Sequence, residues 1–470
     1  MKPLRLLLLA LLAFAVSAGT PKPAETTHLK LIVGVTDDTA KWMNRQDGIV
    51  GVHRDLRLMA VRVTIPWKPR QVRPTRLQQV YLHRIARMVQ LNDRIVLAVY
   101  NTARYAPTTA RLRKQYCSFL GGVVRRIPLI HDVEIWNEAN SPAYWPEADG
   151  AAGYAALLAR CYDVLHDRPG PINVISSTAS RHDPGSFVFA LGDAYRASGR
   201  TRRLFDTFGH NPYPADSAEP PWVLHEGSDL IAEGDYETLM NVLSTAFEDT
   251  PQPVPGVRGV TIWYVEDGFQ TVAPPDKLRY YRGRENDLHA IPALAPRSGK
   301  NVVDQATQLR DAILLAYCQP AVSGFLNFGL LDEDRLGGWQ AGLLWRDGTR
   351  KPSYDTFKAA IAEVRRRDTD CSKIRGVPSS SPRAARSGLP QHLLHGKTGR
   401  SVRGASPSRP RGRLRRRACH IPRTRLQRGG DDHRDPRPCR RSRPGEADRR
   451  RRRRLDGWDG RPRRVLAGQS

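Results

Sequence analysis

The sequence lacks the short motifs that mark nucleotide-dependent and metal-dependent enzymes. It contains no P-loop and no His-Glu-x-x-His helix, and none of its six cysteines forms a close CxxC pair. Those patterns supply the phosphate cradle of nucleotide-binding proteins and the ligands of common zinc sites. We therefore expect no metal site and no organic cofactor.

Long apolar runs are also scarce, and only one stands out. The basic start over residues 1–5 is followed by an apolar run over 6–16 and then by Ser17-Ala18. This order is typical of a secretory signal peptide, which we predict over 1–18, with cleavage after Ala18 and a linker over 19–28. An uncleaved anchor is the alternative, but the run is short for a bilayer span. The expected product is a secreted protein without a transmembrane segment.

Acidic residues are rare in the last hundred positions. The whole chain carries a formal charge of +28, but residues 371–470 hold 30 Lys and Arg against 7 Asp and Glu. This segment has no Phe or Tyr and is rich in Arg, Pro, Gly and Ser, so we predict a disordered tail. It could bind anionic polymers, or it could be inert or a shifted reading frame. The first 370 residues carry only +5, so no nucleic-acid partner is expected for them.

The body of the chain alternates strand-like and helix-like segments. Helix-like periodicity occurs, for example, over 77–89, 112–124, 151–165, 236–247, 302–318 and 352–364. The strand-like runs are 31–35, 58–64, 95–100, 133–136, 172–176, 205–208, 260–265 and 325–328. Eight such repeats predict an α/β fold of the (β/α)8 TIM-barrel type over 29–370, with long βα loops. A doubly wound open sheet is the rival, but Asp37-Asp38 stand where its Gly-rich turn would be.

Four of the cysteines fall in or next to predicted helices. If those helices are neighbours on one barrel, Cys117 can pair with Cys161, and Cys318 with Cys371. Export to an oxidising compartment would favour these disulfides. Buried free thiols are the alternative.

The ends of the predicted strands carry polar side chains, and in a TIM barrel these ends form the active-site face. The fourth strand ends in Trp136-Asn137-Glu138 and the seventh in Glu266. The sixth is followed by His210-Asn211-Pro212-Tyr213. Because side chains alternate along a strand, Glu134 lies below Glu138 in the interior and needs a partner, for which Arg62 is the candidate.

These motifs resemble the clan A glycoside hydrolases, the cellulase-like retaining enzymes of family 5 and related families. Trp136-Asn137-Glu138 is similar to their acid/base signature, and Glu266-Asp267-Gly268-Phe269 to their nucleophile strand. Arg62, His210 and Tyr213 match positions that surround the sugar in that clan. The segment from Gly342 to Tyr354 resembles their closing turn and last helix. The likeness spans about residues 29–368.

The resemblance implies a retaining glycosidase that acts on a β-linked oligo- or polysaccharide. We expect the protein to be a monomer. Glu138 would be the acid/base and Glu266 the nucleophile. Asn137, His210, Tyr213, Arg62 and Trp67 would bind the substrate or support the nucleophile. A non-catalytic carbohydrate-binding barrel, or a polyanion-binding protein acting through its tail, are the alternatives.

Two departures from the clan pattern and several aromatic residues bear on the substrate. Asp267 adds a carboxylate that could raise the pKa of Glu266, and Phe328 stands where many relatives have a stacking Trp. The segment over 271–300 carries Tyr280 and Tyr281 and is expected to lie over the cleft. Further tryptophans on predicted loops near the rim are Trp67, Trp145, Trp222 and Trp339.

Overall fold

The computed structural model describes residues 30–377, apart from residues 92, 149, 257–258, 286–289 and 296–302. The predicted signal peptide lies outside these residues, and so does the predicted tail from 378 onward. Within the described ranges, every helix is too short or too polar to cross a membrane.

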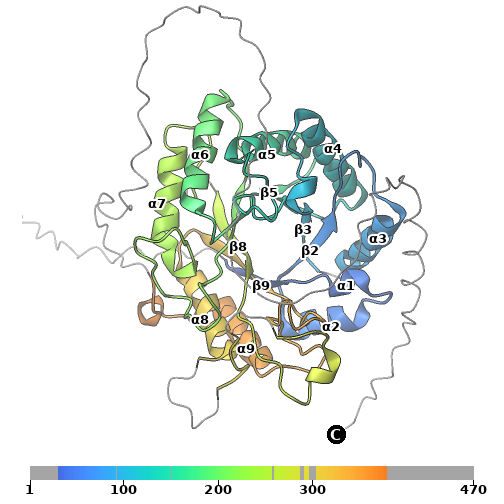
Figure 1. Ribbon diagram of the computed structural model, residues 1–470, viewed down its shortest axis with the longest axis vertical. Coiled ribbons are helices and arrows are strands. Elements are labelled where there is room, and N and C mark those ends of the chain that lie inside the picture. Colours follow the sequence, from blue (N-terminus) through green and yellow to red (C-terminus); the bar gives the residue numbers. More distant parts are fainter. Residues whose placement is uncertain are drawn as a thin grey trace, which may run out of the picture. The chain divides into compact units, whose positions relative to one another are not determined.

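The described residues form a closed barrel of parallel strands with helices around the outside (Figure 1). The pairing order runs from β5 through β4, β3, β2, β1, β9 and β8 to β7, and a β5–β7 pairing closes the ring. The strands are β1 (Ile32–Thr36), β2 (Ala60–Pro66), β3 (Ile95–Tyr100), β4 (Asp132–Ile135), β5 (Asn173–Ile175), β6 (Thr178–Ala179), β7 (Thr207–Asn211), β8 (Thr261–Asp267) and β9 (Val322–Phe328). Closure confirms the predicted (β/α)8 barrel and excludes the open doubly wound sheet.

The outer layer is made of helices that return the chain to the start of each next strand. They are α1 (Thr39–Trp42), α2 (Asp47–Leu56), α3 (Arg76–Gln90), α4 (Ala110–Arg126), α5 (Gly150–His166), α6 (Pro184–Ala197), α7 (Tyr236–Phe247), α8 (Gln305–Cys318) and α9 (Ser353–Arg366). Short 3-10 turns are η1 (Ala103–Tyr105), η2 (Glu233–Asp235), η3 (Leu278–Tyr280) and η4 (Cys371–Lys373).

Local sequence signals account for several helix starts. Thr75 caps α3 and forms a capping box with Gln78, while the Thr109 and Asp304 side chains cap α4 and α8. Each cap satisfies backbone N–H groups that have no partner inside the helix. Pro184 occupies the first turn of α6, where the missing N–H costs little.

The fifth barrel position differs from the prediction of one continuous strand. It is split into β5 and β6, because the backbone N–H of Ser177 donates to the Tyr154 hydroxyl of α5 at 2.8 Å instead of to a strand. The sixth predicted strand also begins and ends later than expected, as β7. His210 and Asn211 therefore belong to the strand itself rather than to the loop after it.

The core has two layers. A large cluster fills the space between the sheet and the helices, and a small one lies inside the barrel: Ala60, Val96, Ile175, Trp263, Val265 and Leu326. Trp263 fits there because its β9 neighbour is Gly324, where a Cβ would lie 2.6 Å from the indole ring. The interior of the described barrel is therefore packed with side chains, as is usual for this fold.

Both predicted disulfides are present in the structure. Cys117 of α4 pairs with Cys161 of α5, and Cys318 of α8 pairs with Cys371 of η4. The first joins two helices that also pack against each other, and the second fastens residues that follow the last helix. The alternative of buried free thiols is therefore excluded for all four.

Candidate active site

Arg62 lies at the centre of the strand ends and is completely buried. Its Nε and Nη2 atoms donate to the carboxylate of Glu134, as the sequence predicts. Nη1 donates to Glu266 Oε1 at 2.5 Å, and Nη2 also donates to Asn137 Oδ1 at 2.9 Å. One guanidinium from β2 thus joins β4, the turn that follows β4, and β8.

Glu266 reaches this cluster because β8 is irregular. Trp263 and Val265 face the barrel interior, so strict alternation would turn the next residue toward the helices. The pairing of β8 with β9 shifts register between Tyr264 and Asp267. This bulge lets Glu266 follow Val265 on the inner side and contact Arg62.

Glu138 lies on a turn with an unusual backbone. Trp136 has φ +70° and Glu138 has φ +38°, both in the left-handed region that non-glycine residues rarely occupy. The backbone N–H of Glu138 donates to Ser177 Oγ at 2.9 Å, and Asn211 Nδ2 donates to Glu138 Oε1 at 2.9 Å. Glu138 is the partly exposed member of the pair and Glu266 the buried one.

The two carboxyl groups share one electrostatic environment. Burial raises the pKa of Glu266; Arg62 opposes the rise, and the charges of Glu138 and Glu134 add to it. Burial also raises the pKa of Glu138, against the hydrogen bond from Asn211. Two such groups are not easily ionised together. Burial leaves the pKa of Glu266 at about 7, but the direct contact with the guanidinium favours the ionised form of Glu266 over that of Glu138.

Three tyrosines line this pair. The hydroxyl of Tyr213 lies 3.4 Å from Glu266 Oε2, and Tyr100 packs edge-on against Tyr144 with ring centroids 5.7 Å apart. Burial raises the pKa of each hydroxyl, and the charge of Glu266 adds to the rise in all three cases. The phenols therefore stay neutral and can donate hydrogen bonds. Of these three, only Tyr213 is predicted from the sequence as a site residue.

A cleft of about 280 Å³ opens above Glu138. Tyr213, Gln270 and Trp339 are among the residues that line it. The Trp339 ring lies 5.2 Å from Tyr213 and 5.5 Å from Phe328, centroid to centroid, so the three form one aromatic wall. An indole is thus present at this wall although β9 itself ends in Phe328. It comes from the loop that follows β9.

Two residues predicted to contact substrate do not reach the cleft. His210 is fully buried; its Nδ1 bonds Thr178 Oγ1 and its Nε2 bonds the Ile231 carbonyl. Trp67 is also fully buried, packs edge-on against Tyr116 and donates from Nε1 to a backbone carbonyl. Both side chains are thus engaged inside the fold, and their binding to substrate stays a prediction. Burial also lowers the pKa of His210 to about 4, so its ring is neutral.

Asn211 is the site residue that the sequence analysis missed. Phe208 and His210 lie stacked on the helix-facing side of β7, so Asn211 faces the interior. Its Oδ1 has no hydrogen-bond partner among the described residues, although the atom is buried. Alternation along β7, with Phe208 as the buried reference, could have identified it. The predicted influence of Asp267 on Glu266 is minor beside burial and the charges of Glu138 and Glu134.

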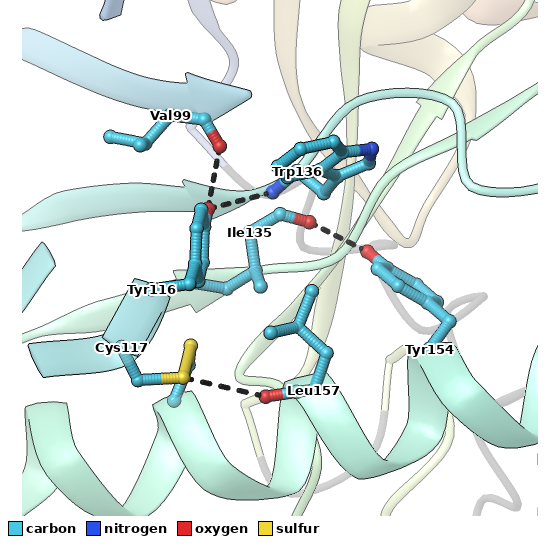
Figure 2. The surroundings of a disulfide bond; sticks show 8 residues. Val99, Tyr116, Cys117, Ile135, Trp136, Tyr154 and Leu157 are labelled. Atoms are coloured by element: carbon cyan, nitrogen blue, oxygen red, sulfur yellow. Dashed lines mark hydrogen bonds between the residues drawn. A yellow bond between two sulfur atoms is a disulfide. The ribbon is translucent and has the colours of Figure 1, made fainter. Parts of the chain in front are cut away.

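The turn that carries Glu138 is held from behind by two tyrosines of the helix layer (Figure 2). The Tyr116 hydroxyl donates to the Val99 carbonyl at 2.5 Å and accepts from the Trp136 N–H at 3.2 Å. The Tyr154 hydroxyl donates to the Ile135 carbonyl at 2.9 Å. Tyr116 precedes the disulfide-bonded Cys117, so the covalent link between α4 and α5 ties both phenols to one support.

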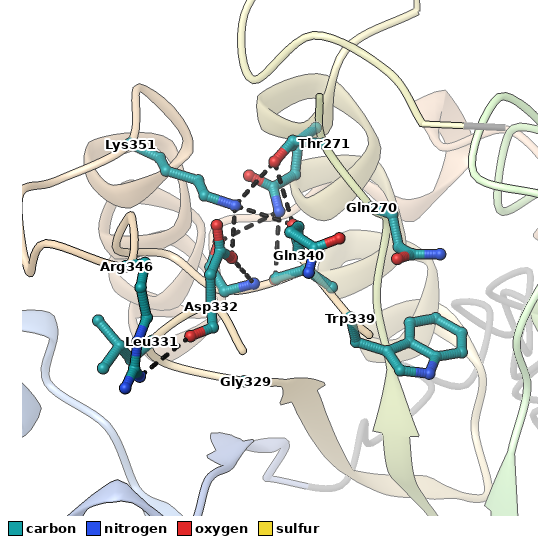
Figure 3. Close-up of polar contacts among 12 residues, drawn as sticks. Gln270, Thr271, Gly329, Leu331, Asp332, Trp339, Gln340, Arg346 and Lys351 are labelled. Carbon is teal, nitrogen blue, oxygen red and sulfur yellow. Dashed lines mark hydrogen bonds and ion pairs between the residues drawn. The ribbon is translucent and has the colours of Figure 1, made fainter. Parts of the chain in front are cut away.

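A second buried cluster supports the aromatic wall (Figure 3). The Lys351 ammonium donates to Asp332 Oδ1 at 2.7 Å, to Thr271 Oγ1 at 2.8 Å and to the Gln340 carbonyl at 2.8 Å. Lys351 and Asp332 are completely buried as an ion pair. Because Gln340 follows Trp339 directly, this cluster fixes the loop from which the indole enters the cleft.

Known proteins give a likeness in structure but not in sequence. No family model matches the chain, and no curated protein is significantly similar to it. A family 39 glycoside hydrolase from the gut symbiont Bacteroides cellulosilyticus WH2 matches 71% of this chain and 64% of its own length, with 16% identity and a TM-score of 0.51. The GH53 catalytic domain of Ignisphaera aggregans matches 72% of this chain and 98% of its own, with 14% identity and a TM-score of 0.49. The chain thus spans less than two thirds of the first structure, and that first likeness shows a shared fold.

Proposed function

We propose that this protein is a retaining glycoside hydrolase of clan A that cleaves O-glycosidic bonds in a β-linked glycan. The observation that carries the proposal is the nearness of two carboxyl groups at the strand ends: Glu266 of β8 is held by Arg62, and Glu138, after β4, is close enough for its charge to act on Glu266. A protonated and an ionised carboxyl at one cleft are the two groups that glycosidic cleavage requires. The shared fold with a family 39 glycoside hydrolase supports the same reading.

The different contacts of the two carboxyls support a separate role for each. Glu138 holds the proton and would give it to the glycosidic oxygen, while ionised Glu266 attacks the anomeric carbon. Water then hydrolyses the glycosyl enzyme, with Glu138 as the base. Arg62 fixes Asn137 Oδ1, so the Asn137 amide N–H is left to donate to a sugar hydroxyl. The unpartnered Asn211 Oδ1 offers an acceptor at the same place.

The first test replaces the nucleophile. Glu266→Ala should lose at least about 10³-fold in turnover of an activated aryl β-glycoside, because the covalent step has no other carboxylate. Added azide should restore turnover by occupying the space of the missing carboxylate. Undiminished turnover in Glu266→Ala would refute the assignment. The panel of aryl glycosides that is cleaved would identify the sugar.

A second test separates catalysis from simple sugar binding. A 2-deoxy-2-fluoroglycoside with a good leaving group should label Glu266, and peptide mapping should find the adduct there. A non-catalytic carbohydrate-binding barrel would bind the sugar without forming an adduct. Glu266→Gln, which keeps the shape of the side chain, is the matched control and should remain unlabelled.

We also propose that the protein is exported. The predicted signal peptide over 1–18 lies outside the described residues, but the Cys117–Cys161 and Cys318–Cys371 disulfides support an oxidising compartment. Secretion of the full chain from its host, with an N-terminus at Gly19, would be the expected result. Retention of Met1 in the mature protein would contradict cleavage. Polyanion binding by the segment over 378–470 stays a separate proposal, tested by removing that segment.

A further inference from the structure

Basic residues are concentrated in one part of the barrel. Between residues 56 and 131, which contain β2, α3, β3 and α4, the chain has 15 Lys and Arg but a single acidic residue, Asp93. The rest of the first 370 residues holds 30 basic and 39 acidic residues. The near-neutral charge of the body therefore conceals a strongly positive part.

Six of these side chains lie on the face that carries the active site. They belong to the β2–α3 and β3–α4 loops and to the beginnings of α3 and α4, and in a TIM barrel these segments share the face of the strand ends. All six are exposed. We call this set the basic rim: Lys68, Arg73, Arg76, Arg104, Arg111 and Lys114.

Contacts between the two loops hold the basic rim together. The Lys68 ammonium lies 5.3 Å and the Arg104 guanidinium 5.6 Å from the centroid of the Tyr105 ring. The backbone N–H of Arg70 donates to Gln115 Oε1 at 3.0 Å, which joins the β2–α3 loop to α4. Two cations thus share one aromatic ring, a surface that suits a sugar with a negative group.

The basic rim is continuous with the wall of the active site. Its Arg104 belongs to η1, which begins three residues after Tyr100 at the end of β3. The Arg62 guanidinium lies 5.9 Å from the centroid of the Tyr100 ring. The backbone N–H of Ala103 also donates to the Ala143 carbonyl, next to Tyr144. The rim residues do not line the cleft itself, so a polymer would meet these loops where it extends beyond the cleft past Tyr144.

The charges of the basic rim are not neutralised within the described residues. Other cations of the same part have acidic partners: Arg87 pairs with Asp47 and Arg94 with Asp132. No acidic side chain pairs with any of the six rim residues in the described ranges. The segment over 371–470 is itself strongly basic, so it is unsuited to cover them. The basic rim is therefore free to bind an anionic molecule.

We propose that the substrate is an acidic glycan whose carboxylate or sulfate groups bind the basic rim while a glycosidic bond lies between Glu138 and Glu266. This inference rests on the proposed function, since that function makes a polysaccharide the molecule in the cleft. Continuity with the active site favours a glycan over a nucleic acid or a membrane, neither of which would extend into the cleft.

The test measures binding without turnover. Full-length Glu266→Ala protein is offered three polymers with the same β-glucan backbone: carboxymethyl cellulose, cellulose sulfate and neutral hydroxyethyl cellulose. In that background, Arg111→Gln with Lys114→Gln removes two rim charges at the start of α4. The matched control, Arg125→Gln with Arg126→Gln, removes two charges at the other end of the same helix.

Each rim charge should contribute about a factor of two to affinity, as exposed ion pairs do. The variant with Arg111→Gln and Lys114→Gln should then bind the anionic polymers about fourfold more weakly than its parent. Adding Arg73→Gln and Arg76→Gln should bring the loss of affinity to about fifteenfold. Rising salt should reduce these differences. The control pair should bind like its parent. Weaker binding to carboxymethyl cellulose would identify carboxylate as a group that the basic rim recognises. Weaker binding to cellulose sulfate would identify sulfate.

Equal binding by the rim and control variants, or equal affinity of the parent for the neutral polymer, would overturn the inference. Failure of the proposed function is distinguishable from either result. It would appear as rim-dependent binding in a protein that cleaves no glycoside and takes no fluoroglycoside label.

Discussion

The ends of β4 and β8 each present one carboxyl group, but the two are held by different means. Glu138 lies on a turn of left-handed backbone that is fixed from behind by Tyr116 and Tyr154. Glu266 is placed by a bulge and held by the Arg62 guanidinium. The group that must carry a proton thus has neutral partners, and the group that must carry a charge has a cation. The Glu138 end thus relies on an unusual backbone and neutral hydrogen bonds, whereas the Glu266 end relies on a charged side chain.

Removing the cation should have the largest effect. Arg62→Met would leave Glu134 and Glu266 buried without a counter-charge, which costs about 3–5 kcal/mol in stability. In any folded protein, turnover should fall at least about 10³-fold because Glu266 would take up a proton. Arg62→Lys keeps the charge but cannot reach both carboxylates, so it should fold better and remain impaired. Thermal unfolding and single-turnover kinetics check both, and full activity in Arg62→Met would contradict the assigned role.

Breaking the support of the β4 turn should have the next largest effect. Replacing Cys117 and Cys161 by Ser should cost about 4 kcal/mol, because the disulfide closes a loop of 44 residues in the unfolded chain. The Cys318–Cys371 disulfide closes a similar loop of 53 residues and makes a matched control. Both pairs of substitutions should lower the melting temperature similarly. Only the loss of Cys117–Cys161 should also lower kcat, since it loosens the support of Glu138. Equal kcat values in the two variants would show that the disulfide between α4 and α5 does not contribute to catalysis.

Asp267 allows a test at the β8 end that leaves the reacting groups in place. Burial raises the pKa of this carboxyl to about 7, above its usual 3.8. Between those values the folded state holds a proton that the unfolded state has lost, so stability falls as pH rises from about 4 to 7. Asp267→Asn does not titrate and keeps an oxygen for the Gly268 N–H. It should gain on the order of 4 kcal/mol at pH 7 and little at pH 4; a uniform gain at both pH values would contradict the shift.

The sequence predicted the elements of this site more reliably than the direction of its side chains. Eight repeats, the two glutamates and the Arg62–Glu134 pair follow from periodicity and from polar residues at strand ends, and these are found in the structure. His210 was expected at the rim, but it lies inside β7, two residues after the helix-facing Phe208. Alternation therefore turns His210 toward the helices and Asn211 toward the barrel interior. Trp67, which follows β2, is buried against Tyr116 instead of facing the cleft.

Other features of the fold and the site could not be predicted from the sequence and are recognised only in the folded barrel. The β8 bulge that turns Glu266 inward has no Gly or Pro to mark it in the sequence. The break between β5 and β6 depends on a hydroxyl from α5, which is distant in the chain. Helices α1 and α2 are short and were not among the segments named from periodicity. Long-range contacts of this kind override local propensity.

The smallest expected effect concerns the neutral partner of Glu138. Asn211 donates to Glu138 and favours its ionised form, so this hydrogen bond lowers the pKa of the carboxyl. Asn211→Ala should raise that pKa and move the alkaline limb of the kcat/KM profile up by about one pH unit. Asn211→Asp should move it further, because a like charge would face Glu138. The acid limb, which reports ionisation of Glu266, should stay in place in both variants. Movement of the acid limb instead would mean that Glu138 is the ionised group and Glu266 the protonated one. The neutral partners at β4 and the cation at β8 would then not set the protonation states of the two carboxyls.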